Sequence, residues 1–390
     1  MSKVQGDIVI VGAGIAGLTA ALALRQAGYA VRICEQAPEL GEVGAGLSLS
    51  PNAVKGLGSL GLGEFLASEA NEPLMQYLHH GETGEDLVVF DRHNCRSEYG
   101  AAYLQIHRAD FHAELLRRLR QDPNVELTLG SPAVDIRLEA DKPTVYFEDG
   151  SRDTAEALIG ADGIRSAVRD FLFPDHGASF TGHMAWRGLL PAEKLPSWYG
   201  EAASHVWVGP GRNFVVYPIR KGKLINFVAF GRAEQWVEET WSARADAYEI
   251  RDHFAGWCDG VSTLIDSLDS TDCFRWGLFA REPLDAIVHG RIALIGDAAH
   301  PMLPFMGQGA SSAIEDGVVI GRCFGLEDAP DAALARYERA RLDRVRMVQQ
   351  ESNLGADRLQ ALDPNVLKTQ PLRNEDSLGI FHYNPATVPV

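Results

Sequence analysis

The N-terminal run DIVIVGAGIAGLTAALAL, residues 7–24, constrains the fold more than any other stretch of the chain. Four consecutive apolar residues, 8–11, lead into Gly12, Gly14 and Gly17, after which apolar residues recur at helical spacing. This order predicts a buried strand, a tight turn and a helix. Such a turn brings the backbone close to a pyrophosphate, and the helix N-terminus offers free N–H groups to phosphate oxygens. We therefore expect a dinucleotide to bind here.

The residues after this helix support a dinucleotide fold. Gly28 is suited to end the helix, and residues 29–34 alternate like a second strand that ends at Glu35. An acid at that strand end, about 20 residues beyond the glycines, hydrogen-bonds an adenosine ribose in such folds. Because glycine-rich turns also occur by chance, the alternative is a glycine-bearing core strand followed by an unrelated Glu.

Composition narrows the class of protein. The chain of 390 residues is long enough for two domains, or for one domain with a large insertion. Its 36 Lys and Arg against 53 Asp and Glu give a formal net charge of −17, which repels nucleic acid and anionic membrane surfaces. Five scattered cysteines without a C-x-x-C pair predict neither a disulfide framework nor a metal site. We expect a soluble, cytoplasmic protein that binds neither nucleic acid nor membrane.

The rest of the sequence alternates between segments typical of the nucleotide-binding domain and segments typical of a second, inserted domain. Short alternating runs rich in aromatic residues, between about 180 and 279, predict an antiparallel sheet whose aromatic side chains either pack in a core or line a substrate pocket. The tail beyond about residue 362 carries no strong pattern. The expected fold class is α/β, a discontinuous Rossmann-like domain with an inserted antiparallel-sheet domain and a long C-terminal helix. The expected boundaries are 1–75, 98–179 and 280–330 for the nucleotide-binding domain, 76–97 and 180–279 for the substrate-binding sheet domain, and 331–390 for the C-terminal helix and tail.

A second glycine turn follows another buried strand late in the chain. The stretch GRIALIGDAAHP, residues 290–301, places Asp297 at the carboxyl end of the strand, where ligands of open α/β sheets bind. The stretch PFMGQGASSAIEDG, residues 304–317, predicts a glycine loop that opens a helix. A second helix N-terminus is thus expected at the same crevice, where it can stabilise negative charge.

Three motifs now stand in order along the chain. They are the G-x-G-x-x-G run with Glu35, the run GADGIRSAVR at 160–169, and RIALIGDAAHPMLPFMGQGASSAIEDG at 291–317. Together they resemble the single-component, FAD-dependent aromatic hydroxylases (class A flavoprotein monooxygenases), and the resemblance covers essentially the whole chain. The stretches YLQIHRADFHAEL and TGHMAWRGLLP favour the branch of salicylate, 3-hydroxybenzoate and 6-hydroxynicotinate hydroxylases over the epoxidases and reductases.

The resemblance implies a reaction. The expected activity is hydroxylation of a small aromatic or heteroaromatic compound with NAD(P)H and O2, through a flavin C4a-hydroperoxide. The chain has only one full dinucleotide fingerprint, so NAD(P)H is expected to bind transiently, without a Rossmann domain of its own. Alternatives are a flavin oxidase, reductase or epoxidase on the same scaffold, and a nucleotide-binding regulatory protein without activity. The protein is expected to be a monomer or a homodimer.

The resemblance also implies a cofactor site. By it, the glycine turn and Glu35 hold the ADP half of FAD, Arg108 contacts the cofactor, Asp297 binds the ribityl or ribose region, and residues 304–310 lie against the flavin ring. Asp162, in the Asp-Gly motif, is implicated in handling both FAD and NAD(P)H. The expected cofactor-binding set is Gly12, Gly14, Ala16, Gly17, Glu35, Gln36, Gly46, Leu47, Arg108, Asp162, Asp297, Pro304, Gly307, Gln308, Gly309 and Ala310.

The catalytic base is where this chain departs from the family pattern. Several relatives place a His four residues before a Tyr, and here the matching stretch, residues 213–217, begins with Asn213 and ends with Tyr217. Because Asn cannot act as a base, three explanations are open. Asn213 hydrogen-bonds a substrate that is already activated, another residue such as Tyr217 or His300 assists, or the substrate is not a phenolic acid. We favour the first.

Each remaining site residue has a structural alternative. Tyr217 is equally a strand aromatic with a local hydrogen bond, whereas for His300, beside Asp297, the structural role of holding its loop is the stronger alternative. Arg187 can meet a substrate carboxylate, or it can stack on an aromatic ring. The expected substrate set is Arg187, Tyr217, Pro301 and Met302.

Overall fold

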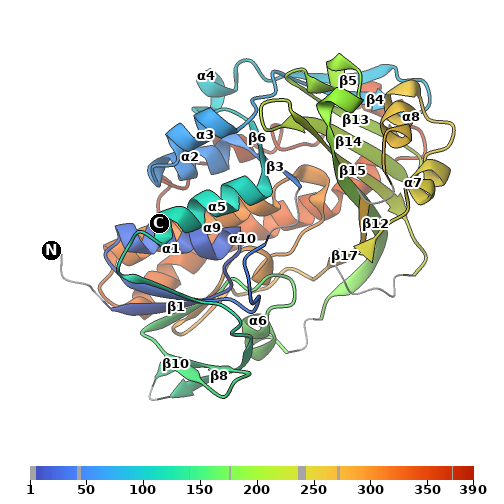
Figure 1. Cartoon of the computed structure of the whole chain (residues 1–390). Coiled ribbons are helices and arrows are strands. Elements are labelled where there is room, and N and C mark those ends of the chain that lie inside the picture. The colour runs from blue at the N-terminus through green and yellow to red at the C-terminus, as the bar shows by residue number, and fades with distance from the viewer. Residues whose placement is uncertain are drawn as a thin grey trace.

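The computed structural model describes residues 6–41, 45–139, 141–174, 177–235, 243–269, 273–370 and 372–390. Two large sheets organise these residues (Figure 1), which confirms the expected α/β fold class and the long C-terminal helix. Residues 42–44 of the glycine-dense segment after Glu35 lie outside the described residues.

The first sheet contains six strands. Its inner strands pair in parallel because each is buried on both faces, as their nearly continuous apolar residues require. Only the edge pair β18–β19 is antiparallel. In spatial order the strands are β18 (Val288–His289), β19 (Ile292–Leu294), β11 (Ala157–Gly160), β1 (Asp7–Val11), β2 (Ala30–Cys34) and β7 (Val125–Thr128).

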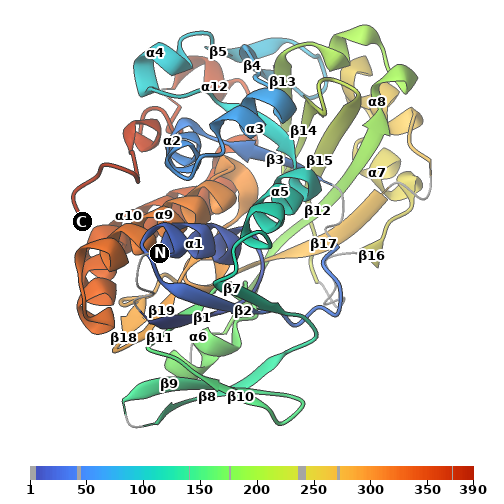
Figure 2. The same ribbon diagram turned by 60° about the vertical axis from the view of Figure 1, so that its left-hand side comes forward.

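Helices cover this sheet, and the closest pair is α1 with α9 (Figure 2). The two helices approach closely because Gly317 and Gly321 face α1, where a Cβ at Gly317 would lie 2.8 Å from the backbone nitrogen of Ala20. The principal helices of this layer are α1 (Ile15–Gln26), α5 (Arg108–Leu119), α9 (Gly309–Leu326) and α10 (Pro330–Asn353).

The second sheet contains eight strands, antiparallel except for the pair β13–β4. Alternation along β14 sends Phe214 and Val216 to a core under α7 (Ala247–His253) and α8 (Asp259–Asp266), while Asn213, Val215 and Tyr217 face the opposite side. In spatial order the strands are β16 (Ala243–Arg244), β17 (Cys273–Ala280), β12 (Ser179–Pro191), β15 (Leu224–Arg232), β14 (Arg212–Ile219), β13 (Ala203–Gly209), β4 (Met75–His80) and β5 (Asp86–Asp91).

Smaller elements complete the fold. A three-stranded sheet lies at the end of the molecule away from α4 and β5, in both views. Its strands pair antiparallel in the order of the sequence. The elements are the sheet of β8 (Ala133–Glu139), β9 (Lys142–Phe147) and β10 (Arg152–Thr154), the pair β3 (Gly46–Leu49) and β6 (Leu104–His107), and the helices α2 (Pro51–Ser59), α3 (Gly63–Glu69), α4 (Cys95–Tyr99), α6 (Ala167–Leu172), α11 (Gly355–Leu359) and α12 (Val366–Thr369).

Buried charge joins α9 to α10. The Arg341 guanidinium of α10 donates to Glu315 Oε2 at 2.6 Å and to Asp316 Oδ1 at 2.8 Å, and Arg344 donates to Glu315 as well. Arg341, Glu315 and Asp316 are buried. This network fixes α10 against α9, the helix that follows the late glycine loop. No helix in the described part of the chain has the length and apolar character needed to cross a membrane.

Candidate active site

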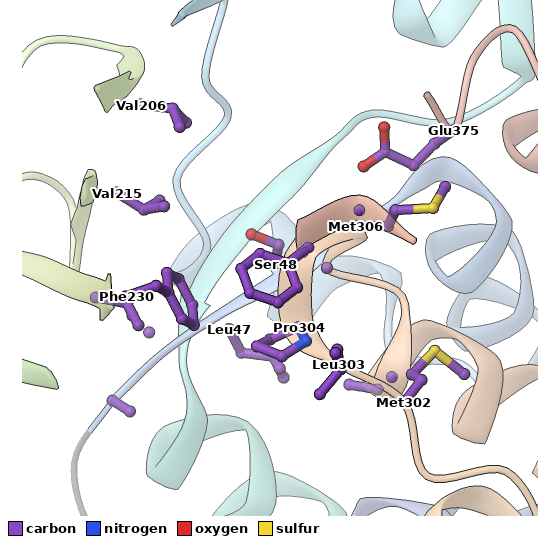
Figure 3. A pocket seen from close by; sticks show the side chains of 18 of the residues that line it. Leu47, Ser48, Val206, Val215, Phe230, Met302, Leu303, Pro304, Met306 and Glu375 are labelled. Carbon is purple, nitrogen blue, oxygen red and sulfur yellow. The ribbon is translucent and has the colours of Figure 1, made fainter. Parts of the chain in front are cut away.

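A cavity of about 530 Å³ lies between the two large sheets. Figure 3 shows Val206, Val215 and Phe230 of the eight-stranded sheet on one side and Leu303 and Pro304 facing them. The cavity also reaches the glycine turn before α1, strand β3 and the C-terminal segment after α10. Its walls are mainly apolar with a few polar groups, which is the usual make-up of a small-molecule site.

The glycine turn leaves an open cradle at one end of the cavity. A Cβ at Gly14 meets no heavy atom of the described residues within 4 Å, and Gly14 is the N-cap of α1 without a side-chain cap. By contrast, Gly12 has φ +106°, and a Cβ at Gly17 would overlap the Gly12 carbonyl oxygen. Gly12 and Gly17 therefore build the turn, whereas Gly14 leaves room for a ligand at the helix N-terminus.

The late glycine loop provides a second open helix end at the same cavity. Gly309 begins α9, lines the cavity and, like Gly14, has no heavy atom of the described residues within 4 Å of a built Cβ. Gly307, two residues before the helix, has φ +63°, a conformation that favours glycine. Two helix N-termini thus face one space, and both can stabilise negative charge there.

Glu35 lies at the end of β2, as its position in the sequence predicts, and ties the first turn in place. Its carboxylate accepts hydrogen bonds from the backbone N–H of Ala13 at 2.7 Å and of Ala37 at 2.9 Å. Gln36 beside it is exposed. Neither side chain lines the cavity, and Ala16 does.

Arg108 and Asp297 both line the cavity. Arg108 begins α5, and its backbone N–H donates to the Ala45 carbonyl at 2.9 Å, which holds α5 against the start of β3. Asp297 lies in the turn after β19 with its side chain exposed to the cavity, and desolvation by the surrounding protein raises the pKa of its carboxyl group, with His300 and Arg108 opposing the rise. The structure therefore brings these two sequence-predicted residues together.

The loop 301–307 forms the wall opposite the eight-stranded sheet, and α10 holds it. Gln349 donates to the Pro301 carbonyl at 2.9 Å, and the Ser352 hydroxyl donates to the Leu303 carbonyl at 2.9 Å. Met302 and Pro304 line the cavity from this loop. The rigid attachment to α10 fixes the distance between the loop and the sheet.

Tyr217 lies directly against strand β3. A Cβ at Gly46 would lie 2.5 and 2.6 Å from the Tyr217 ring and hydroxyl, so that only glycine fits there. The Asn226 side chain accepts from the Gly46 backbone N–H at 2.6 Å and fixes the same contact. Burial raises the pKa of the Tyr217 hydroxyl above its ordinary value, so it is protonated at neutral pH and can act as a donor.

Asn213 is fully buried, with 0% of its surface exposed, and lines the cavity. Its Oδ1 accepts a hydrogen bond from Gln360 Nε2 at 3.0 Å. Its Nδ2 has no hydrogen-bond partner among the described residues. Arg187 also lines the cavity, and its guanidinium lies 5.0 Å from the centre of the Trp276 ring, the stacked arrangement that the sequence leaves open.

Three predicted residues have protein partners instead of cavity positions. His300 is buried with its Nε2 2.6 Å from Asp316 Oδ2 on α9. Asp162 accepts from the Ser166 hydroxyl at 2.5 Å and so holds the turn before α6. Gln308 Oε1 accepts from Ser50 and Asn52 at 3.3 Å. These contacts position the loops that surround the cavity.

Sequence patterns missed a buried arginine in the wall. Arg92 donates to Gln76 Oε1 at 3.0 Å, and its guanidinium lies 5.1, 5.6 and 5.3 Å from the ring centres of Phe90, Tyr103 and Phe381. The aromatic rings keep this cation within an otherwise apolar region. A lone Arg in a strand-like run gives no signal of such an enclosure.

The C-terminal segment supplies a second missed residue. Glu375 lines the cavity, and its carboxylate points into it in Figure 3. Burial raises the pKa of this carboxyl group, and Arg92 opposes the rise. The tail has no periodic pattern, so only the folded chain brings Glu375 to the site.

The chain matches known proteins over most of its length. The model of the FAD binding domain family matches residues 5–352. The chain is 38% identical to 3-amino-4-hydroxybenzoate 2-monooxygenase PtnB3 of Streptomyces platensis over 347 residues, 88% of this chain and 86% of that protein. It is 33% identical to 6-hydroxynicotinate 3-monooxygenase of Pseudomonas fluorescens over 389 residues, 98% and 96% of the two chains. Among solved structures, a salicylate hydroxylase substrate complex superposes over all of both chains with a TM-score of 0.83 at 30% identity.

Proposed function

Because this chain belongs to the FAD-binding-domain family of aromatic hydroxylases, we propose that its cavity holds FAD at the glycine-lined end and a small aromatic substrate beside the eight-stranded sheet. The chain is an NAD(P)H-dependent flavoprotein monooxygenase. The proposed substrate is of the salicylate, hydroxybenzoate or hydroxynicotinate type. When bound, FAD supplies hydride acceptance from NAD(P)H and the activation of O2 for transfer of a hydroxyl group to the ring.

One observation supports the placement of FAD above all others. Gly14 and Gly309 begin two helices that open onto one cavity, and at both positions the space that a Cβ would occupy is open. A diphosphate at α1 and the negative charge of a reduced flavin at α9 would each meet N–H groups and a favourable helix dipole.

The proposed roles of the other cofactor residues follow from their positions. Gly12, Gly17 and Glu35 shape and brace the first turn. Arg108 of α5 and Asp297 of the turn after β19 line the same cavity and would hold the part of FAD between its diphosphate and its ring. The remaining members that line the cavity or brace its loops are Ala16, Gly46, Leu47, Asp162, Pro304, Gly307, Gln308 and Ala310. Gln36 is exposed beside Glu35, and its proposed contact with the cofactor rests on the family resemblance alone.

At the reacting end, the proposed substrate contacts are Arg187, Tyr217, Pro301 and Met302, with Asn213 as a hydrogen-bond donor. Because His300 is paired with Asp316, we assign it the holding of the loop before Pro301 instead of a proton transfer. The protonated Tyr217 hydroxyl can donate to the substrate or to an oxygen that develops charge.

The test is rapid-mixing measurement of flavin reduction by NADH and by NADPH, with and without a panel of hydroxybenzoates and hydroxypyridines. The proposal expects an aromatic compound to accelerate reduction and to yield a product heavier by one oxygen atom. A flavin oxidase or reductase would instead release only peroxide, with no hydroxylated product from any compound. A colourless purified protein would support a regulatory role without catalysis.

A further inference from the structure

Gln360 donates a hydrogen bond to Asn213, the residue that stands where several relatives are expected to have a His. It follows α11 in the C-terminal segment, 147 residues from Asn213, and is 4% exposed. Its backbone N–H donates to the Ala356 carbonyl at 2.9 Å, and its own carbonyl accepts from the Gly211 N–H at 3.1 Å. Gln360 is therefore fixed to the β13–β14 turn by its backbone and to Asn213 by its side chain.

Asn213 itself has little freedom to move. It lies in a central strand, paired with Val208 of β13 on one side and Phe230 of β15 on the other. With its Oδ1 occupied by Gln360, its Nδ2 is the atom left without a partner among the described residues. Buried amide nitrogens are rarely left unpaired, because the lost hydration costs free energy that no contact offsets. A ligand acceptor in the cavity would meet this need.

We propose that Gln360 is a positioning residue that turns the Asn213 amide so that its Nδ2 donates to an oxygen of the substrate, and that the substrate binds with this oxygen already ionised or in its oxo form. The inference rests on the proposed function, because it concerns the substrate of that same cavity. It narrows the substrate class to readily ionised phenols and to hydroxypyridines that exist as pyridones.

The chemistry of the donor explains why a base can be absent. A phenolate or oxo oxygen accepts from the amide N–H more strongly than a neutral phenol oxygen does, because the acceptor carries more negative charge. An ionised oxygen also makes the ring more electron-rich and more reactive toward hydroxylation. The phenol proton leaves for water before binding, so no protein group has to accept it. Asn213 thus selects the activated form instead of producing it.

Replacing the amide nitrogen of Gln360 by oxygen should reverse the orientation of the Asn213 amide. The Oε1 of Gln360 has no partner among the described residues, so rotating both amides together would keep one hydrogen bond and turn Asn213 Oδ1 to the cavity. A Glu at 360, when ionised, can only accept, so Gln360→Glu forces this rotated arrangement. The site would then favour a neutral phenol.

The experiment measures binding of 4-nitrophenol, whose ionised form is yellow, to the FAD-loaded protein across pH. The measured quantity is the ratio of the dissociation constants of the neutral and ionised forms. The wild type is expected to favour the ionised form by about tenfold or more, which lowers the pKa of the bound probe by about one unit. Gln360→Glu is expected to lose or invert this preference. Gln370→Glu, which adds the same charge at an exposed position of the same segment, is expected to retain it.

Two outcomes would overturn the assignment. One is a Gln360→Glu protein that keeps the wild-type preference, and the other is a wild type that binds neither form or favours the neutral one. If Gln360→Glu fails to retain FAD, Asn213→Asp provides the same test, because Gln360 then donates to one carboxylate oxygen and the other faces the cavity. Failure of the proposed function is seen separately, as absence of effector-stimulated flavin reduction in the wild type.

Discussion

Gly14, the N-cap of α1, and Gly17, in the first turn of that helix, should tolerate substitution differently. Gly14→Val places its side chain in open space with an ordinary φ, so we expect a folded protein that loses most of its FAD because the cradle is filled. Gly17→Val drives its Cβ into the Gly12 carbonyl, so we expect a protein that does not fold. Flavin absorbance per chain after gel filtration, together with thermal unfolding, measures both. Full flavin content in Gly14→Val would refute the cofactor placement.

Asn213 gives the second prediction at the residue scale. Asn213→His restores a side chain that can accept a proton, so phenols that ionise only at high pH should become substrates. We expect kcat/KM for such phenols to rise at least about tenfold above the pKa of the new His, with little change for compounds that are already ionised. The pH profiles of kcat/KM for one compound of each kind measure this. If Asn213→His lowers kcat/KM equally for both kinds of compound, a base at this position does not assist the reaction.

At the scale of elements, the α9–α10 pair depends on one buried arginine. Arg341→Met leaves Glu315 and Asp316 as buried carboxylates without their main cation, so we expect a loss of about 3–5 kcal/mol in the free energy of unfolding. Urea unfolding measures it. The control is Arg346→Met on the same helix, whose partner Asp285 is 93% exposed, where we expect a change of at most about 1 kcal/mol. Equal losses of unfolding free energy in the two variants would show that the buried Arg341 pairs contribute no more than an exposed ion pair.

The same network makes stability depend on acid pH. Burial raises the pKa of Asp316, but the electrostatic pull of His300 and Arg341 outweighs it and lowers the pKa from 3.8 to about 2. Because the folded pKa is depressed, the stabilisation is present above about pH 4 and is lost as pH falls toward about 2. It amounts to about 2 kcal/mol by linkage. Urea unfolding at a series of acid pH values should show this loss, and Asp316→Asn should remove its share of the pH dependence.

At the scale of the whole molecule, features encoded within one continuous stretch can be predicted from the sequence, whereas contacts between distant segments cannot. Glu35 is predictable because strand, glycine turn and helix lie within one continuous stretch, and the fold class follows from such units. The Gln360–Asn213 pair and Glu375 are not predictable, since a tail without hydrophobic periodicity returns to a strand far back in the chain. Tertiary contacts alone place these residues, and no local pattern encodes them.

The returning tail gives the last prediction. Glu351 at the end of α10 pairs with Arg358 and Arg373, both at 2.5 Å, and so ties down two arginines of the tail that line the cavity. Glu351→Gln weakens both pairs. We expect KM for the aromatic substrate to rise about three- to tenfold, and more NAD(P)H to be spent on peroxide because water enters the cavity.

FAD retention should not change in Glu351→Gln, because the glycine turns lie on other elements. The ratio of hydroxylated product to NAD(P)H consumed measures the effect. The matched control is Lys368→Met, which breaks the exposed pair with Glu85 in the same segment and should leave that ratio unchanged. If both variants stay fully coupled, the tail contributes residues to the wall but does not seal it. A loss of coupling in Glu351→Gln alone would mean that the ion pairs of the tail, and not the sheet, keep water from the reacting ring.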